Sequence, residues 1–237
     1  MNGFDRRVAI VTGGSQGIGA AIVDGYRRQG WAVVANSRTI KPSDDHLVHT
    51  IDGDVSDSST VDRIIDGALE VFGRIDTLVN NAGVFISKPF TEYTDADYET
   101  VVGVNMTGFF RLTQRVIDVM LRGGGGHVVN ITTTLVDHPS STVPSALTSL
   151  TKGGLAAATR SLAIEYASRG IRVNAVSPGV IQTSSHGAEA YAALGALHPL
   201  GRVGQVGDIV DGILFLEASP FITGEILHID GGQVAGR

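Results

Sequence analysis

Four glycines stand close together near the N-terminus, in the run Thr12-Gly13-Gly14-Ser15-Gln16-Gly17-Ile18-Gly19. The run follows an apolar stretch at residues 8–12 and leads into a helical pattern at residues 17–29. Glycine lets the chain turn sharply and lets backbone N–H groups approach an anion, and a helix N-terminus adds partial positive charge. The run therefore predicts a loop that binds the pyrophosphate of a dinucleotide. The alternative is a glycine-rich turn that binds nothing.

The end of the next expected strand, at residues 31–36, bears on which dinucleotide would bind. Rossmann-type proteins that bind NAD usually place Asp or Glu there, bonded to the ribose 2′-hydroxyl. Here the strand ends in Asn36, and Ser37 and Arg38 follow. A hydroxyl and a guanidinium can bind a 2′-phosphate, which a carboxylate would repel. The pattern favours NADP over NAD. Alternatively, Arg38 is a solvated surface cation.

Short apolar runs alternate with helical patterns along the chain. We expect strands at residues 8–12, 31–36, 49–51, 77–80, 127–131, 172–177 and 226–229, and helices at residues 17–29, 60–72, 97–121, 151–168 and 206–216. Strands this apolar are typical of a parallel sheet covered on both faces. The sequence therefore predicts a single α/β domain over residues 1–237, with a Rossmann-type doubly wound parallel sheet of about seven strands flanked by helices.

Composition excludes several classes of protein. The chain has no cysteine, which excludes disulfides, thiolate metal sites and a thiol nucleophile. A net charge of -6 without a Lys/Arg run argues against nucleic-acid binding. No apolar run approaches the length of a membrane span, and the N-terminus does not resemble a signal peptide. We expect a cytoplasmic protein whose main partner is a small molecule. No metal is expected, since His46 and His49 lack further ligands nearby.

Other motifs follow the glycine run in a fixed order: Asn80-Asn81-Ala82-Gly83, the segment around Asn105, Arg172-Val173-Asn174-Ala175-Val176-Ser177-Pro178-Gly179, Thr223-Gly224 and Asp230-Gly231-Gly232. In order and spacing the chain resembles the short-chain dehydrogenase/reductase family over nearly its whole length. The glycine run has the spacing Gly-x-x-x-Gly-x-Gly, which is that family's.

The resemblance implies a nicotinamide dinucleotide along the carboxyl ends of the strands. In the family, the residue matching Asp54 meets the adenine amino group, and the Thr matching Thr183 contacts the cofactor beside the nicotinamide. The predicted cofactor-binding residues are Gly13, Ser15, Gln16, Gly17, Ile18, Gly19, Ser37, Arg38, Asp54, Val55, Asn81, Ala82, Gly83, Lys152, Pro178, Gly179, Val180, Ile181 and Thr183. Asp54 could instead cap the following helix. Gln16 stands where NADP-preferring relatives often carry Arg or Lys.

The resemblance also implies catalytic roles. In the family a Tyr exchanges a proton with the substrate oxygen, and a Lys four residues later holds the nicotinamide ribose and lowers the Tyr pKa. A Ser polarises the substrate carbonyl, and an Asn positions a water and supports the Lys. Lys152, Thr133 and Asn105 match the Lys, Ser and Asn, but Thr148 stands at the Tyr position. An aliphatic hydroxyl is far less acidic than a phenol, so we expect Thr148 only to hydrogen-bond a substrate oxygen.

Other residues could replace the missing acid. His138 or Asp137 would lie beside the nicotinamide, although His138 could be an exposed loop residue, and Tyr191 is a second candidate. Residues 184–197 are small and apolar, and would form either a substrate lid or a helix that only packs against the domain.

The leading hypothesis is an NADP(H)-dependent oxidoreductase acting on a small carbonyl, imine or alcohol. Reduction of a protonated iminium needs no acid at Thr148, so that substitution points toward imines. The missing Tyr equally supports a non-catalytic NADP-binding protein with a sensing or interaction role, and a non-redox enzyme on the same fold is a third hypothesis. The resemblance further implies a homodimer or homotetramer, packed through helices 97–121 and 151–168 and the last strand.

Overall fold

The protein is described from a computed structural model, which covers residues 6–183 and 188–236. Seven parallel strands form one sheet in the order β3-β2-β1-β4-β5-β6-β9, and β7 and β8 form a separate pair. The strands are β1 (Val8–Thr12), β2 (Ala32–Ser37), β3 (Val48–Asp52), β4 (Thr77–Asn80), β5 (Gly126–Ile131), β6 (Ile171–Pro178), β7 (Ile181–Gln182), β8 (Gly204–Gln205) and β9 (Ile226–Ile229). The predicted Rossmann-type sheet is confirmed.

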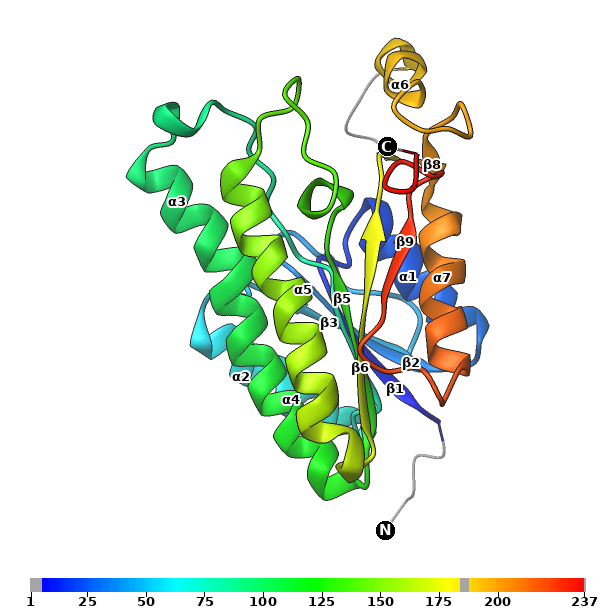
Figure 1. The fold of residues 1–237 in the computed structure, drawn as a ribbon. Coiled ribbons are helices and arrows are strands. Elements are labelled where there is room, and N and C mark those ends of the chain that lie inside the picture. The colour runs from blue at the N-terminus through cyan, green and yellow to red at the C-terminus, as the bar shows by residue number, and fades with distance from the viewer. Residues whose placement is uncertain (1–5, 184–187, 237) are drawn as a thin grey trace.

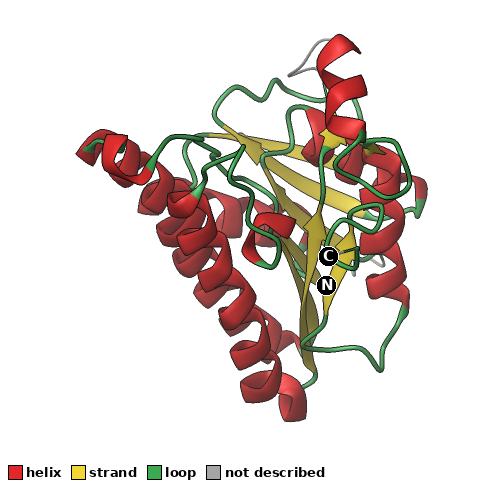
Figure 2. Ribbon diagram, turned by 45° about the horizontal axis from the view of Figure 1, so that its top comes forward, coloured by secondary structure: helices red, strands yellow, loops and turns green. Residues whose placement is uncertain are grey.

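Helices cover both faces of this sheet. They are α1 (Gly17–Arg28), α2 (Ser58–Phe72), α3 (Asp95–Val102), α4 (Phe109–Gly123), α5 (Ala146–Tyr166), α6 (Ala188–Gly195) and α7 (Val206–Ala218). Helices α2, α4 and α5 lie on one face, and α1 and α7 lie on the other (Figures 1 and 2). An apolar core fills each of the two layers. In the part of the chain that the structure describes, no helix combines the length and apolarity needed to cross a membrane.

The strand order reverses direction at β1. From there β2 and β3 extend the sheet to one side, whereas β4, β5, β6 and β9 extend it to the other. The loops that follow β1 and β4 therefore diverge at the carboxyl edge of the sheet. In open α/β sheets such a reversal leaves a crevice in which ligands bind.

The single long helix predicted over residues 97–121 is wrong. The structure begins it at Asp95, where Thr94 and Asp97 form a capping box, and inserts a π-helical segment, Gly103–Gly108, between α3 and α4. Close packing accompanies the change, since a Cβ on Gly108 would lie 2.7 Å from Val55 Cγ1. Isolated π-helical turns often occur at functional sites.

The helix predicted over residues 151–168 also differs in its bounds. It begins at Ala146, just after Pro144, and Thr148 therefore lies in its first turn. Of the expected lid, residues 188–195 form α6, whereas residues 184–187 lie outside the described residues.

The predicted dimer or tetramer stays a prediction. Helix α5 leaves Leu150 and Ile164 60% and 80% exposed.

A buried polar cluster ties α7 to the amino ends of the strands. One oxygen of Glu217, Oε2, accepts hydrogen bonds from Tyr26 at 3.1 Å and from Thr77 at 2.9 Å, and lies 3.0 Å from His127 Nδ1. Asn174 Nδ2 donates to His127 Nε2, because the amide oxygen of Asn174 already accepts from a backbone N–H. His127 is therefore neutral, and its Nδ1–H donates to Glu217.

We expect Glu217→Ala to lower the free energy of unfolding by about 3 kcal/mol, because it leaves three buried donors without an acceptor.

Acid should weaken the same cluster. Burial lowers the pKa of His127 below its ordinary value, so the unfolded chain takes up a proton that the folded chain excludes. Stability should therefore fall as the pH drops below about 6.5. Urea titrations from pH 8 to pH 5 measure both effects, and Glu70→Ala, on the exposed side of α2, is the control.

Candidate functional site

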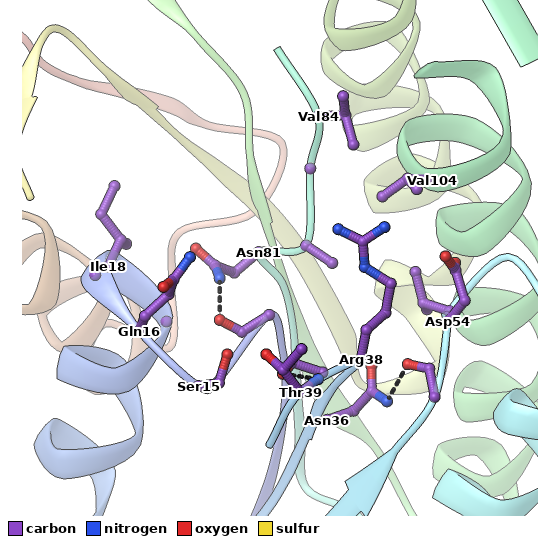
Figure 3. Close-up of a pocket in the computed structure, with 18 of the residues that line it drawn as sticks. Ser15, Gln16, Ile18, Asn36, Arg38, Thr39, Asp54, Asn81, Val84 and Val104 are labelled. Carbon is purple, nitrogen blue, oxygen red and sulfur yellow. Dashed lines mark hydrogen bonds between the residues drawn. The ribbon is translucent and has the colours of Figure 1, made fainter. Parts of the chain in front are cut away.

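A cavity of about 300 Å³ opens at the carboxyl ends of β1 to β4, where the strand order reverses (Figure 3). All of the cofactor-binding residues predicted up to Gly83 line it, and so does Thr183. Five further residues that no motif predicted also line it: Asn36, Thr39, Gly53, Val84 and Val104. Asn36 and Thr39 flank the predicted Ser37 and Arg38, so their position at the end of β2 was a usable signal. Val84 and Val104 belong to no motif of their own.

At two of its positions the glycine loop has no room for a side chain. Gly13 has a φ of 68°, and a Cβ there would lie 2.8 Å from Asn81 Nδ2. At Gly19 an added Cβ would lie 2.0 Å from the carbonyl oxygen of Gly13, well inside van der Waals contact. The loop therefore turns so tightly that only backbone atoms separate β1 from α1.

The N-terminus of α1 faces this cavity without a cap of its own. Gln16 is the N-cap residue, yet its side chain makes no capping hydrogen bond, and the first turn contains no acidic residue. The first N–H groups of a helix have no partner within the helix and carry partial positive charge. This end of α1 is therefore suited to an anionic group such as a phosphate.

The loops around the glycine run are held by uncharged side chains. Thr12 Oγ1 accepts hydrogen bonds from the N–H groups of Asn81 and Ala82 at 3.1 and 3.0 Å. Asn81 Nδ2 donates to the carbonyl oxygen of Thr12 at 2.9 Å. On the other side, Asn36 Nδ2 donates to Gly53 O at 3.1 Å. These bonds fix the end of β1 to that of β4, and the end of β2 to that of β3.

Ser37 and Arg38 form one wall of the cavity. Figure 3 shows the Arg38 guanidinium extending across the cavity toward Val84 and Val104. Arg38 is exposed, and Ser37 Oγ accepts from the Thr39 N–H at 3.3 Å, which leaves its hydroxyl hydrogen available to a ligand. The wall therefore presents a cation and hydroxyl groups where an NAD-binding protein has a carboxylate.

Asp54 lines the cavity and is not the cap of α2. The N-cap of that helix is Asp57. The carboxylate of Asp54 accepts instead from the N–H and the hydroxyl of Ser56, at 2.9 and 2.8 Å. The capping alternative is therefore wrong, and the adenine-binding role stays a prediction.

Asn105 is buried in the π-helical segment and is fully bonded. Its Oδ1 accepts from the Val84 N–H at 2.8 Å, and its Nδ2 donates to Val84 O at 3.0 Å and to Thr151 Oγ1 at 3.1 Å. The structure thus uses this side chain to hold Val84, which lines the cavity. It does not join Asn105 to Lys152.

Lys152 lies behind the cavity wall. Its Nζ donates to Ile131 O at 2.6 Å, and a Cβ on Gly83 would lie 3.1 Å from that nitrogen. Burial lowers the pKa of Lys152 from its ordinary value to about 8. An amine with such a pKa exchanges protons readily near neutral pH.

Thr148 and Thr133 complete the predicted catalytic set. The Thr148 side chain is 3% exposed, and its hydroxyl has no hydrogen-bond partner within the described structure. Thr133 is partly exposed, and its hydroxyl accepts from the Leu135 N–H at 3.3 Å. No hydrogen bond of the described residues joins these two hydroxyls to each other or to Lys152.

Of the residues proposed as substitute acids, Asp137 and Tyr191 are bonded through their side chains, and His138 is bonded through its backbone. Asp137 Oδ2 lies 3.1 Å from His228 Nε2 on β9, and the N–H of His138 donates to Thr134 O. Tyr191 donates its hydroxyl to Thr183 O at 2.7 Å and accepts from the Thr183 N–H at 3.0 Å. The Asp137 and Tyr191 side chains are therefore hydrogen-bonded in this structure, and the acid roles of Asp137, His138 and Tyr191 stay predictions.

Most of the residues predicted to bind the cofactor at the end of β6 and just after it lie outside this cavity, and their role stays a prediction. Pro178, Gly179, Val180 and Ile181 do not line the cavity, although Thr183 does. Val180 instead borders a separate depression of about 580 Å³ between α7 and β9. Among the residues that the structure describes, no three His, Asp or Glu side chains gather as metal ligands would.

Comparison with known proteins extends over nearly the whole chain. A sequence model of the family described as enoyl-(acyl carrier protein) reductase matches residues 13–233. The 3-oxoacyl-(acyl-carrier-protein) reductase FabG of Thermotoga maritima is 33% identical, over 98% of this chain and 99% of its own length. Both comparisons span the glycine loop, the cavity and α5.

Solved structures show the same similarity. ElxO with NADP bound has a TM-score of 0.89 at 30% identity, and the match covers 97% of this chain and 99% of that one. The 3-ketoacyl-(acyl-carrier-protein) reductase from Brucella melitensis, complexed with NADH, has a TM-score of 0.88 at 27% identity, covering 98% and 99% of the two chains.

Gly19→Ala should weaken the binding of NADPH about tenfold or more, because its methyl group would displace Gly13 and misplace the N–H groups beside it. Titration of nicotinamide fluorescence measures the affinity. The matched control is Gly207→Ala in α7, where an added Cβ meets nothing within 4 Å. Equal affinities in the two variants would contradict the role given to the loop.

Proposed function

This chain belongs to the short-chain dehydrogenase/reductase family of oxidoreductases, and from that membership we propose that it transfers a hydride between NADP(H) and a small carbonyl, imine or alcohol substrate. The observation that carries the proposal is the cavity itself. It joins a glycine loop, an uncapped helix N-terminus and the Ser37–Arg38 wall in one place. A dinucleotide offers a diphosphate for the first two and a ribose for the third.

The residues of this cavity suit a dinucleotide that carries an additional phosphate. A 2′-phosphate at the end of β2 would meet the Arg38 guanidinium and the hydroxyls of Ser37 and Thr39. Charge-assisted hydrogen bonds to phosphate are among the stronger ones in proteins. Similar structures hold NADP in one case and NADH in another, so the preference rests on these side chains.

When bound, the nicotinamide ring would supply or accept the hydride. The chain must then provide or remove a proton at the substrate oxygen. Thr148 is a poor acid, since an aliphatic hydroxyl ionises far less readily than a phenol. The Lys152 Nζ lies directly behind Gly83, which lines the cavity, and burial lowers its pKa to about 8. We infer that this ammonium gives its proton to the oxygen of a ketone or aldehyde, and is protonated again from water. A protonated iminium needs no such transfer, so imines remain in the substrate class.

Arg38→Leu should raise the dissociation constant of NADPH about 10- to 100-fold and leave that of NADH nearly unchanged, because only NADPH has the 2′-phosphate. Fluorescence titration with each nucleotide measures the two constants. Arg28→Leu, an exposed residue at the far end of α1, serves as the control. An equal loss for both nucleotides would assign Arg38 to adenine stacking instead.

The pH dependence of turnover tests the role of Lys152. With its pKa near 8, the ammonium should support NADPH-dependent ketone reduction below that pH, and the rate should fall as the pH rises through about 8. Thr148→Val should keep this midpoint, whereas Lys152→Met should remove ketone reduction. NADPH oxidation recorded from pH 6 to pH 10 gives these profiles. A wild-type protein that binds NADPH and reduces no ketone or imine would be the non-catalytic alternative.

A further inference from the structure

Two side chains connect α6 and the turn after it to the segment that follows β6. Tyr191, in α6, exchanges two hydrogen bonds with the backbone of Thr183, as described above. His198, just beyond α6, accepts a hydrogen bond from the Val180 N–H at 3.0 Å through its Nε2. Its other nitrogen, Nδ1, lies 3.1 Å from the carbonyl oxygen of Leu194 in α6. We call Tyr191 and His198 the α6 clasp.

The hydrogen bonds of His198 determine its tautomer. The Val180 N–H can only donate, so Nε2 must accept, and the ring hydrogen must sit on Nδ1. A carbonyl oxygen can only accept, and Leu194 O is therefore the acceptor for that hydrogen. Both ring nitrogens are used, and the side chain is 3% exposed. His198 thus acts as a neutral bridge between α6 and Val180.

Two glycines, Gly179 and Gly231, leave room for the His198 side chain. A Cβ on Gly179 would lie 2.6 Å from His198 Nε2, and a Cβ on Gly231 would lie 3.2 Å from His198 Cβ. The ring therefore packs against bare backbone on two sides. The carbonyl oxygen of His198 also accepts from the Gly201 N–H at 2.8 Å, which closes the turn that follows α6. Main chain and side chain together hold the residue in one position.

The clasp reaches the cofactor cavity through Thr183. That residue lines the cavity, and a Cβ on Gly17 would lie 3.3 Å from its Cγ2 methyl. Thr183 is three residues beyond Val180, so the segment held by His198 is the same segment that closes the cavity next to the glycine loop. A displacement of Val180 would therefore move a wall of the cavity.

We propose that His198 is a positioning residue for the cofactor site, one that fixes the segment from Val180 to Thr183 through Nε2 and fixes α6 through Nδ1. The inference rests on the proposed function, since it makes the affinity for NADPH depend on the hydrogen bond between the Val180 N–H and His198 Nε2. It couples the position of α6 to the position of the cavity wall. His198 touches neither cofactor nor substrate in this role.

Two variants separate the two bonds. In His198→Gln the side-chain oxygen can replace Nε2 as the acceptor for Val180, whereas the donor to Leu194 is lost. In His198→Asn the amide nitrogen can replace Nδ1 as the donor to Leu194, whereas the acceptor for Val180 is lost. The control is His46→Gln, because the His46 side chain is 88% exposed.

We expect a crossed result. His198→Gln should keep the NADPH dissociation constant within about threefold of wild type while speeding hydrogen–deuterium exchange of α6. His198→Asn should raise the constant about tenfold and speed exchange at residues 178–183, with α6 protected as in wild type. A merely structural role would move both readouts together in both variants, and that result, or no change in either variant, would overturn the proposal.

The exchange measurement also separates this proposal from the proposed function. A wild-type protein that binds no NADPH would refute the cofactor assignment and, with it, the effect of His198 on affinity. The crossed exchange pattern would still show that the two bonds hold the two segments. Normal NADPH binding by the wild type with an uncrossed pattern would refute the role of His198 alone.

Discussion

Helix α1 begins so close to the end of β1 that a single added carbon does not fit between them. The position that a Cβ of Gly19 would occupy lies 2.0 Å from the carbonyl oxygen of Gly13. Because no side chain can enter this gap, α1 presents backbone N–H groups to the cavity, with the positive end of the helix dipole behind them. The neighbouring loops adapt to this contact, and Asn81 bonds directly to the carbonyl groups of the glycine loop.

Amide and hydroxyl side chains, which carry no charge, hold the walls of the cavity in place. The charged side chains that line the cavity are therefore not needed to hold its walls. Asn36 holds Gly53, Thr12 holds Ala82, and Asn105 holds Val84. A neutral polar group with all its hydrogen bonds made costs little to bury, whereas an ion is expensive to bury unless it is paired. The charges and dipoles that border the cavity are those of α1, Arg38 and Asp54, and the Lys152 ammonium lies behind its wall at Gly83. This arrangement suits a ligand with phosphates at one side and an adenine at the other.

Sequence patterns predicted most of the sheet. They also predicted the part of the site that lies at the carboxyl ends of β1 to β4. Apolar runs located β1 and β4, and glycine spacing located the loop between β1 and α1, because these features are local. The π-helical turn was not predictable in this way, since it accompanies the contact of Gly108 with Val55, about fifty residues away in the chain. Val180 was assigned to the cofactor on a motif, but its N–H is bonded to His198, which no motif marks.

If Thr148 stands at the position of the family's Tyr, the proton for the substrate oxygen must come from another group. Thr148 and Lys152 lie one turn apart on α5, and one turn of helix is about 5.4 Å long. If the ammonium of Lys152 is the acid, a substrate oxygen must come within hydrogen-bond distance of Nζ, which is held at Ile131 O. The Thr148 hydroxyl is buried and has no partner, which is costly for a polar group unless something binds there. A substrate oxygen that reached Thr148 would supply the hydrogen bond that this hydroxyl lacks within the described structure.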